Sequence, residues 1–369
     1  MRRLLVLLAA VALAASFTVP AMAAEKEVSF YGRVWMDTFM VDRSKELAGY
    51  ASNKSDSDLL WNLPGNGTSR FGANFKWGDM SANIEIRPYP GTDVSARQWN
   101  ATWNFGGGTL LIGHTWSLLY INATICSQCE AGGTAGGYCF WVGSLRQSMV
   151  RLTMGGLTVA LVEPSTSHVV GTTVTHELDT SLPKLEATYA LNVGPVALVP
   201  FLGWQTYDEE VKATGKSYSI DGMVYGLTVK YPIGPGYING QIWMSENGAQ
   251  WGDLYYTGSF GGAYWDGTKI WDEDGTGYAI EAGLALSETM KLAVGYGMVE
   301  YENDSGTAGA GVYEDPASSM YAQLEIQIAP GFWVTPEIGI LDEEDVTKAG
   351  VTTEEGDLTY YGAVWKIHF

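Results

Sequence analysis

All three cysteines of the chain, Cys126, Cys129 and Cys139, lie in one glycine-rich stretch. In an oxidising compartment this spacing predicts one disulfide, and the odd number leaves one thiol over. A metal site is the alternative, because a Cys-x-x-Cys pair, the third cysteine and His168 or His176 would supply the ligands of a tetrahedral zinc site. No histidine follows Cys129 directly, so covalent haem attachment is not indicated. We favour the disulfide and expect no metal or cofactor.

A second set of chemically active side chains is charged and falls on the polar face of segments in which apolar and polar residues alternate. Fixed charges around a narrow aqueous passage orient dipolar solutes and discriminate between ions. The basic members expected on that face are Arg33, Arg70, Lys76, Arg87 and Arg151, and the acidic members are Asp37, Glu85, Glu186, Glu281, Glu325 and Glu337.

Arg97 does not fit this pattern. It shares its parity with the apolar residues Trp99 and Trp103. It therefore lies either beyond the apolar band of its strand or after a β-bulge, which would shift the parity by one residue. Both alternatives stay open at the level of the sequence.

The elements that must position these side chains are short antiparallel strands. Alternation is clearest in residues 28–42 and 320–328, and it recurs along almost the whole chain between Gly- and Pro-rich separators. Short separators such as Trp77-Gly78-Asp79 alternate with long ones such as 117–143, and runs of acidic residues are expected on the long loops. The chain also contains 46 glycines, 21 tyrosines and 14 tryptophans in 369 residues, which favours strands and tight turns over helices.

The last strand has two distinct faces. Tyr361, Trp365, Ile367 and Phe369 fall on one face, and Lys366 falls on the other. An apolar, aromatic face opposite a polar one suits a wall with lipid outside and water inside. We therefore predict an all-β fold: a transmembrane antiparallel β-barrel of about 16 strands. An even number of strands places both ends of the chain at the same rim of the barrel.

The N-terminal segment predicts export. Arg2 and Arg3 precede an apolar run over residues 4–15, and Ala21-Met22-Ala23 provides a small-residue cleavage pattern. These are the parts of a secretory signal peptide, and the run is too short for a membrane-spanning helix. We predict a signal peptide over residues 1–23 and one barrel domain over residues 24–369.

Several short motifs resemble those of the Gram-negative 16-stranded porins. The segments 28–34 and 69–72 look like the first two strands of that family, Ala96-Arg97-Gln98-Trp99 followed by 108–113 resembles the fourth and fifth, and Phe369 resembles the C-terminal aromatic residue that the barrel-assembly machinery reads. The resemblance covers the layout of the whole chain after residue 23. It implies an outer-membrane protein that contacts lipid and lipopolysaccharide, forms a homotrimer and passes small hydrophilic solutes by diffusion.

The resemblance also implies that the third extracellular loop, residues 117–143, folds into the barrel and narrows it. In the family this loop carries an acidic cluster that faces the basic wall, but here Glu130 is its one acid. The loop instead offers the aromatic side chains Tyr138, Phe140 and Trp141. We expect these four residues to line the constriction.

Other functions are less well supported. A net charge of −20 argues against nucleic acid as a partner. We expect no enzyme, because the four histidines lie far apart and in no recognised catalytic pattern. A soluble β-sandwich would not need an apolar face on nearly every strand. The alternatives within the barrel fold are a substrate-selective channel and a structural or adhesive barrel with partner-binding loops. The net charge favours cations whereas the arginines favour anions, so ion preference stays open.

Overall fold

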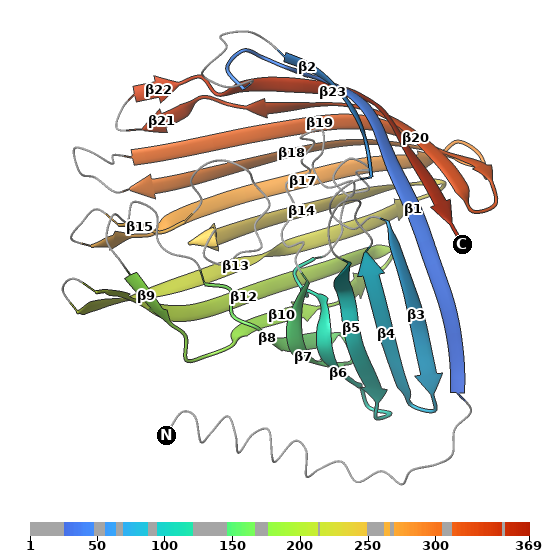
Figure 1. The fold of residues 1–369 in the computed structure, drawn as a ribbon, viewed down its shortest axis with the longest axis horizontal. Coiled ribbons are helices and arrows are strands. Elements are labelled where there is room, and N and C mark those ends of the chain that lie inside the picture. The colour runs from blue at the N-terminus through green and yellow to red at the C-terminus, as the bar shows by residue number, and fades with distance from the viewer. Residues whose placement is uncertain are drawn as a thin grey trace.

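Period-two sequences form β-strands throughout the computed structural model, which describes residues 26–47, 56–63, 69–87, 94–120, 146–166, 176–212, 215–248, 262–265, 269–304, 312–348 and 351–369. Within these residues no helix is long and apolar enough to cross a membrane. Antiparallel strands follow one another around a closed barrel with 16 strand positions, as predicted (Figure 1).

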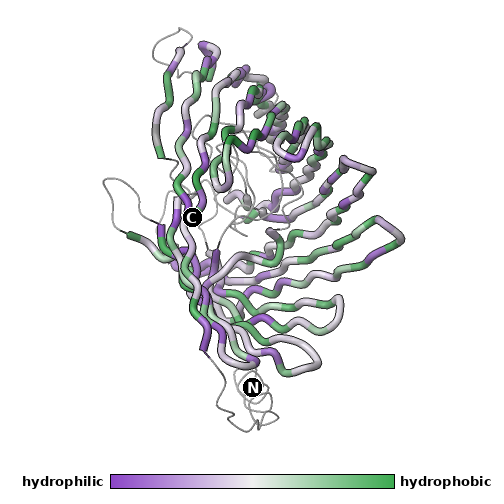
Figure 2. Tube along the Cα trace, turned by 90° about the vertical axis from the view of Figure 1, so that its right-hand side faces the viewer, coloured by the Kyte–Doolittle hydropathy of each residue, from purple (hydrophilic) through white to green (hydrophobic). Residues whose placement is uncertain are grey.

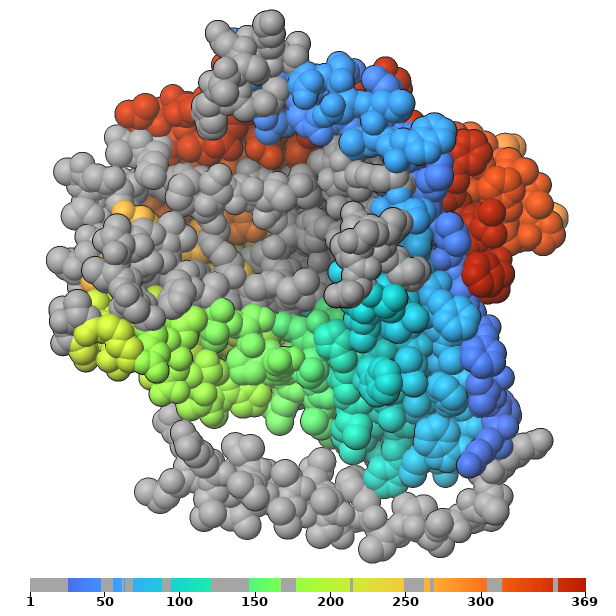
Figure 3. Space-filling model, viewed as in Figure 1, coloured from blue at the N-terminus to red at the C-terminus, as the bar shows by residue number. Residues whose placement is uncertain are grey.

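The barrel closes where the last strand pairs with the first. β23 (Gly356–His368) runs antiparallel to β1 (Lys26–Arg43), with Arg33 opposite His368 and Arg43 opposite Leu358. Figure 3 shows the two strands side by side, β1 in blue and β23 in red. The other barrel strands in chain order are β3 (Arg70–Trp77), β4 (Met80–Arg87), β5 (Ser95–Asn104), β6 (Thr109–Trp116), β7 (Arg146–Met154), β8 (Leu157–Val162), β10 (Lys184–Tyr189) continued by β11 (Leu191–Val193), β12 (Val196–Val211), β13 (Lys216–Ile233), β14 (Gly236–Glu246), β17 (Glu273–Ala285), β18 (Met290–Asp304), β19 (Val312–Ala329) and β20 (Phe332–Glu343).

Shorter strands extend the barrel on the side of the long loops. β2 (Asp56–Asn62) pairs with the second half of β1, and β9 (His176–Asp179) pairs with the end of β12. β21 (Val346–Lys348) pairs with β22 (Val351–Thr353) and with the start of β19. β15 (Tyr264–Trp265) and β16 (Ile270–Trp271) form a separate ribbon.

One hydroxyl group bridges the point where β1 changes partners. β3 pairs with β1 up to Arg33, and β2 takes over from Asp37. The Ser69 Oγ accepts a hydrogen bond from the Trp35 N–H at 3.0 Å and donates one to the Trp35 carbonyl at 3.2 Å. The side chain thus replaces the ladder bonds that neither neighbour supplies.

The short separators are tight turns, as predicted. Gly78, between β3 and β4, has a φ of 58°, and Gly331, between β19 and β20, has a φ of 80°. Residues with a Cβ avoid this region, so glycine fixes where each hairpin turns.

The acidic runs do not all lie on loops, which corrects one sequence prediction. Asp208, Glu209 and Glu210 lie within β12, and Glu209 is fully buried. Glu273 begins β17, and Glu343 ends β20. The strands continue past the apolar band with their hydrogen-bond ladders intact, so charged residues can occupy strand positions there.

Burial follows the pattern expected of a barrel in lipid. Outward side chains such as Phe30 (69% exposed) and Ile367 (50%) are apolar and exposed, whereas inward Glu281 and Asp37 are 0% exposed. Figure 2 shows the corresponding alternation of hydropathy along the strands. The outward faces of β1, β19 and β23 carry the predicted apolar residues, so the parity assignments hold for these strands.

The inner face carries large aromatic side chains as well as polar ones, and eight of these aromatics lie across a glycine of the neighbouring strand. A Cβ at Gly295 or Gly339 would overlap the ring of Tyr321 or Tyr360. Glycine therefore lets the ring lie flat against the wall. The pairs are Tyr31–Gly72, Phe39–Gly362, Phe201–Gly226, Tyr237–Gly283, Trp243–Gly277, Tyr301–Gly275, Tyr321–Gly295 and Tyr360–Gly339.

Candidate functional site: the inner wall of the barrel

Arginines gather on the inner side of one continuous part of the wall, from β1 to β7. We call Arg33, Arg70, Arg87, Arg97 and Arg146 the arginine wall. The sequence predicted the first three of these on the inner face, and it left Arg97 undecided and missed Arg146. Four of them lie on the consecutive strands β1, β3, β4 and β5, and Arg146 lies on β7, beyond β6. Arg97 and Arg146 lie within electrostatic range of each other and of Arg70, so these side chains face the same part of the lumen.

Glu85 is the acidic centre of the arginine wall. Its Oε1 lies 2.7 Å from Arg97 Nε and 3.3 Å from Arg70 Nη1. The Tyr31 hydroxyl donates to its Oε2 at 3.0 Å and accepts a hydrogen bond from Asn83 at 2.9 Å. Glu85 is 2% exposed, so the network fixes two arginines at a buried carboxylate.

A β-bulge decides the position of Arg97. Glu85 pairs with Gln98, but Ile86 pairs with Ala96, so Arg97 is the extra residue between them. The bulge shifts the parity of β5, and Arg97 points inward with 4% exposure. Of the two alternatives left open by the sequence, the bulge is the correct one.

Arg146 is held by an aromatic stack rather than by an acid. Its guanidinium lies 3.5 Å from the centre of the Trp116 ring, and Tyr120 stacks on the same ring at a centroid distance of 4.2 Å. Arg97 approaches this ring at 5.8 Å. No pattern in the sequence pointed to Arg146, because this residue directly follows a long loop and shares the parity of the exposed Ser148 and Val150 on β7.

A third cluster lies where β1 meets β23. Arg33 and Lys366 lie 4.1 Å and 4.7 Å from the Trp35 ring, and the Trp35 Nε1–H donates to His368 Nε2 at 3.4 Å. Lys366 also forms an ion pair with Glu325 at 3.3 Å. Lys366 therefore adds a cation next to the arginine wall, and Asp37 is buried on the same face of β1.

The predicted acidic residues divide into different environments. Glu325 belongs with Lys366, as described above, rather than to a separate acidic wall. Glu281 accepts hydrogen bonds from Tyr237 at 2.7 Å and from Tyr321, and Glu337 accepts one from Tyr360 at 2.9 Å. Both glutamates are buried on the inner face. These two glutamates, on β17 and β20, are thus hydrogen-bonded to tyrosines.

Glu186 holds the chain as it leaves β6. The Ser117 Oγ donates to Glu186 Oε1 at 3.0 Å, and the Leu118 N–H donates to Oε2 at 2.7 Å. Leu119 is fully buried in an apolar cluster that includes Phe39. The first residues of the predicted constriction loop therefore lie on the inner side of the wall. Arg151 is placed inward on β7, within electrostatic range of Glu186.

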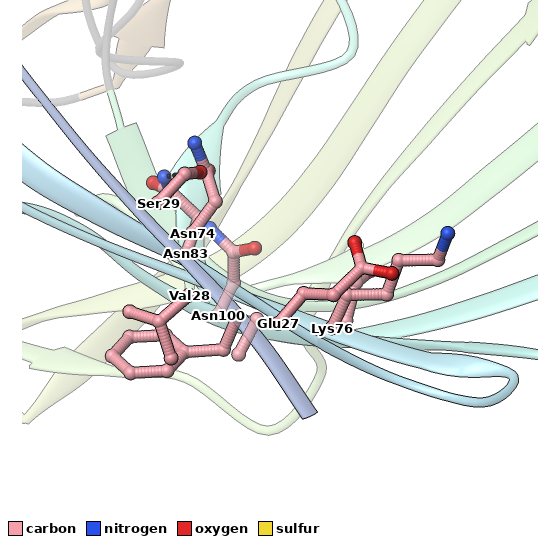
Figure 4. Close-up of a pocket in the computed structure, with 10 residues that line it drawn as sticks. Glu27, Val28, Ser29, Asn74, Lys76, Asn83 and Asn100 are labelled. Carbon is pink, nitrogen blue, oxygen red and sulfur yellow. Dashed lines mark hydrogen bonds between the residues drawn. The ribbon is translucent and has the colours of Figure 1, made fainter. Parts of the chain in front are cut away.

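A pocket of about 440 Å³ lies nearer the short turns. Figure 4 shows Ser29, Asn74, Asn83 and Asn100 along one part of it and Glu27 beside Lys76 along another. Asn83 donates to Asn74 at 2.8 Å. Lys76, a predicted basic residue, thus lies apart from the arginine wall and faces Glu27 across the β1–β3 pair.

The other predicted residues of the long third loop, Glu130, Tyr138, Phe140 and Trp141, lie outside the described residues, as do Cys126, Cys129 and Cys139. The inward fold of that loop and the disulfide stay predictions. Among the residues that the structure describes, no group of three or more His, Cys, Asp or Glu side chains could hold a metal ion.

Comparison with known proteins assigns the family. A family model described as Gram-negative porin matches residues 8–321. The chain belongs to the Gram-negative porins. No curated protein matches the porin at the level of sequence.

Solved outer-membrane channels share the fold of this porin at low sequence identity. The outer-membrane channel DcaP of Acinetobacter baumannii aligns with a TM-score of 0.69 and 14% identity over 95% of this chain and 100% of its own. The anion-selective porin of Comamonas acidovorans aligns with a TM-score of 0.59 and 15% identity over 94% and 100%. OmpF of Salmonella typhi aligns with a TM-score of 0.58 and 10% identity, also over 94% and 100%.

Family and fold together define what the molecule does. The porin is an outer-membrane channel for the diffusion of solutes. The fold and family are those of channels rather than of enzymes. The inner wall of this channel carries the arginines of β1 to β7 and the tyrosine-bound glutamates of β17 and β20.

Proposed function

We propose that this porin conducts small hydrophilic solutes and ions by passive diffusion and that it favours anions. The arginine wall carries the proposal. Five guanidinium groups gather on this part of the wall, and Glu85, which pairs with both Arg70 and Arg97, offsets one of their positive charges. Lys366 lies beside them and is paired with Glu325. A solute therefore meets a positive wall, although the whole chain has a net charge of −20.

Arg87→Ala combined with Arg146→Ala tests this proposal. Loss of two positive charges from the wall should lower the anion-to-cation permeability ratio about twofold or more, because local fixed charge sets the ion content of a narrow passage. The measurement is the reversal potential of the purified porin in planar bilayers under a potassium chloride gradient. Arg43→Ala is the matched control, because Arg43 forms an exposed ion pair with Asp58 at 2.8 Å, away from the wall. An unchanged potential in the double variant would contradict the proposal.

A substrate-selective channel is the second candidate function. The stack of Arg146, Trp116 and Tyr120 favours it, because a guanidinium fixed on an aromatic face is preorganised for a carboxylate. Conductance that saturates with one small organic anion, and loses this saturation in Arg146→Ala, would support the selective channel. Linear conductance for all small ions would support the general porin.

We also infer that the porin is exported with residues 1–23 as a cleaved signal peptide, and that Phe369 is the signal read by the barrel-assembly machinery. The outward apolar band then contacts membrane lipid, with lipopolysaccharide around the loops. We further propose a homotrimer, since OmpT of Vibrio cholerae, which shares the fold with a TM-score of 0.55, is described in a trimer form. Native mass spectrometry tests both points: a mature chain that starts at Ala24 and a threefold mass are expected.

The third loop completes the proposal. We infer that it folds into the lumen from its anchored start at Glu186 and that one disulfide among Cys126, Cys129 and Cys139 stiffens it. Non-reducing mass spectrometry should find a cross-linked peptide, and three free thiols would contradict the disulfide. We also infer that the channel has no enzymatic activity and needs no cofactor, in agreement with its family and fold.

A further inference from the structure

The carboxylate of Glu281 accepts hydrogen bonds from two sides. Glu281 projects inward from β17 and is fully buried. The Tyr237 hydroxyl, from β14, donates to its Oε1 at 2.7 Å, and the Tyr321 hydroxyl, from β19, donates to its Oε2. Each oxygen of the carboxylate therefore has its own phenolic donor, supplied by a different strand.

Two glycines make this arrangement possible. Tyr237 lies opposite Gly283, and a Cβ at Gly283 would overlap its ring. Tyr321 lies opposite Gly295 of β18, and Gly295 lies opposite Glu281. Figure 1 shows β18 between β17 and β19. Because Gly295 has no side chain, Tyr321 can reach across β18 to the carboxylate on β17.

The same combination recurs elsewhere on the inner wall. Tyr31 crosses Gly72 and donates to Glu85, the register partner of that glycine. Tyr360 lies opposite Gly339 and donates to Glu337, which lies on the same strand as this glycine. Burial of a carboxylate is costly unless its charge is stabilised by hydrogen bonds. A tyrosine across a glycine is thus a repeated means of supplying those bonds, and Glu281 is the case with two donors.

Glu281 also lies at a distinctive place in the ring. Counting along the paired strands in either direction, β17 is eight pairings from β5, which carries Arg97. In a barrel of 16 strands this is the diametrically opposite position. Glu281 therefore lies on the strand opposite the one that carries Arg97.

We propose that Tyr237 and Tyr321 are positioning residues that hold Glu281 in its charged form, and that Glu281 is the negative pole opposite the arginine wall. The inference rests on the proposed function and deepens it, because it names the residues that limit the anion preference. The negative pole is supplied by the barrel wall itself, from a carboxylate that two hydroxyl groups keep in place.

The experiment compares reversal potentials in planar bilayers. Glu281→Gln removes the charge and should raise the anion-to-cation permeability ratio about twofold, the scale expected for one fixed charge in a narrow passage. Tyr237→Phe with Tyr321→Phe should raise the ratio in the same direction. In the Glu281→Gln background the two phenylalanines should add no further change, because residues that act through one group are not additive.

The matched control is Tyr278→Phe, which removes a hydroxyl from the outward face of the same strand and should leave the ratio unchanged. Folding is checked first by the heat-dependent mobility of the barrel in gels, and the single variants Tyr237→Phe and Tyr321→Phe replace the double variant if that one fails to assemble. The inference would be overturned if Glu281→Gln left the anion-to-cation permeability ratio unchanged. It would also be overturned if the two phenylalanine substitutions changed this ratio equally with and without Glu281→Gln. If Arg87→Ala with Arg146→Ala still shifts the potential, the proposed function survives that failure.

Discussion

The two sides of the lumen hold their charges in different ways. On the arginine wall, Arg146 lies flat on Trp116, and Arg97 and Arg70 share one carboxylate. On the later strands, Glu281 of β17, opposite the arginine wall, and Glu337 of β20 are buried and bound to tyrosine hydroxyls. Aromatic rings support both signs of charge, by their faces for the cations and by their hydroxyls for the anions. The comparison indicates that hydrogen bonds fix these acids within the wall, whereas an aromatic ring holds the guanidinium of Arg146.

Glu85→Gln should break the arginine wall most strongly. The substitution leaves Arg97 buried without the carboxylate that now accepts its hydrogen bond at 2.7 Å. Removing one partner of a buried ion pair typically costs about 3 kcal/mol in the free energy of unfolding. Urea unfolding in detergent micelles, followed by tryptophan fluorescence, measures this cost. Asp58→Asn, which removes the acid of the exposed pair with Arg43, is the control and should change stability by much less.

Gly295→Val should disrupt the far side next. The valine side chain occupies the space in which the Tyr321 ring lies, and overpacking of this kind costs about 2 kcal/mol. The same unfolding experiment and the yield of folded barrel measure the effect. Gly240→Val is the control, since the nearest atom to a Cβ there is a carbonyl oxygen at 3.5 Å. Equal losses in both variants would contradict a specific role for the aromatic–glycine pair.

Trp116→Leu sharpens the comparison by removing the aromatic support from the positive side. Arg146 then loses the ring 3.5 Å from its guanidinium, an interaction worth about 1 kcal/mol at a partly exposed site. We expect a modest loss of stability together with a lower affinity for small carboxylates that block the ion current. Trp103→Leu, which leaves the Trp116 stack in place, serves as the control. Blocking that is unaffected by Trp116→Leu would show that the stack does not position Arg146.

Ser69→Ala should have the smallest effect. It removes the hydroxyl that bridges the Trp35 N–H and carbonyl at the change of partner along β1. A loss of about 1 kcal/mol is expected for these hydrogen bonds. Hydrogen exchange of the Trp35 amide should speed up locally, while amides of β17 keep their protection. Unchanged exchange at Trp35 would contradict the bridging role.

The barrel and much of its inner face could be predicted from the sequence, because alternation has a direct physical cause in the pleat of a strand. Phe30 and Ile367 face outward and Arg33 and Glu85 face inward for this reason. Arg97 could not be placed, since a bulge changes parity without a clear signal in the sequence. Arg146 was missed because it follows a loop directly.

The tyrosine–glycine–glutamate contacts depend on something that alternation does not contain. Tyr321 reaches Glu281 because Gly295 lies between them in the register of three strands. Likewise, the sequence placed Glu325 on the inner face but did not predict its partner, Lys366, which lies two strands away. Parity gives the face of a side chain, whereas register between strands decides its partner.

The central claim is that the local charge of the inner wall, rather than the net charge of −20, sets the ion preference of the channel. The reversal potential of the unmodified porin in a potassium chloride gradient tests it most directly. We predict a potential of the sign given by an anion-preferring channel, with a preference that weakens as the salt concentration rises and screens the fixed charges. A potential of the opposite sign, showing preference for potassium, would contradict the account.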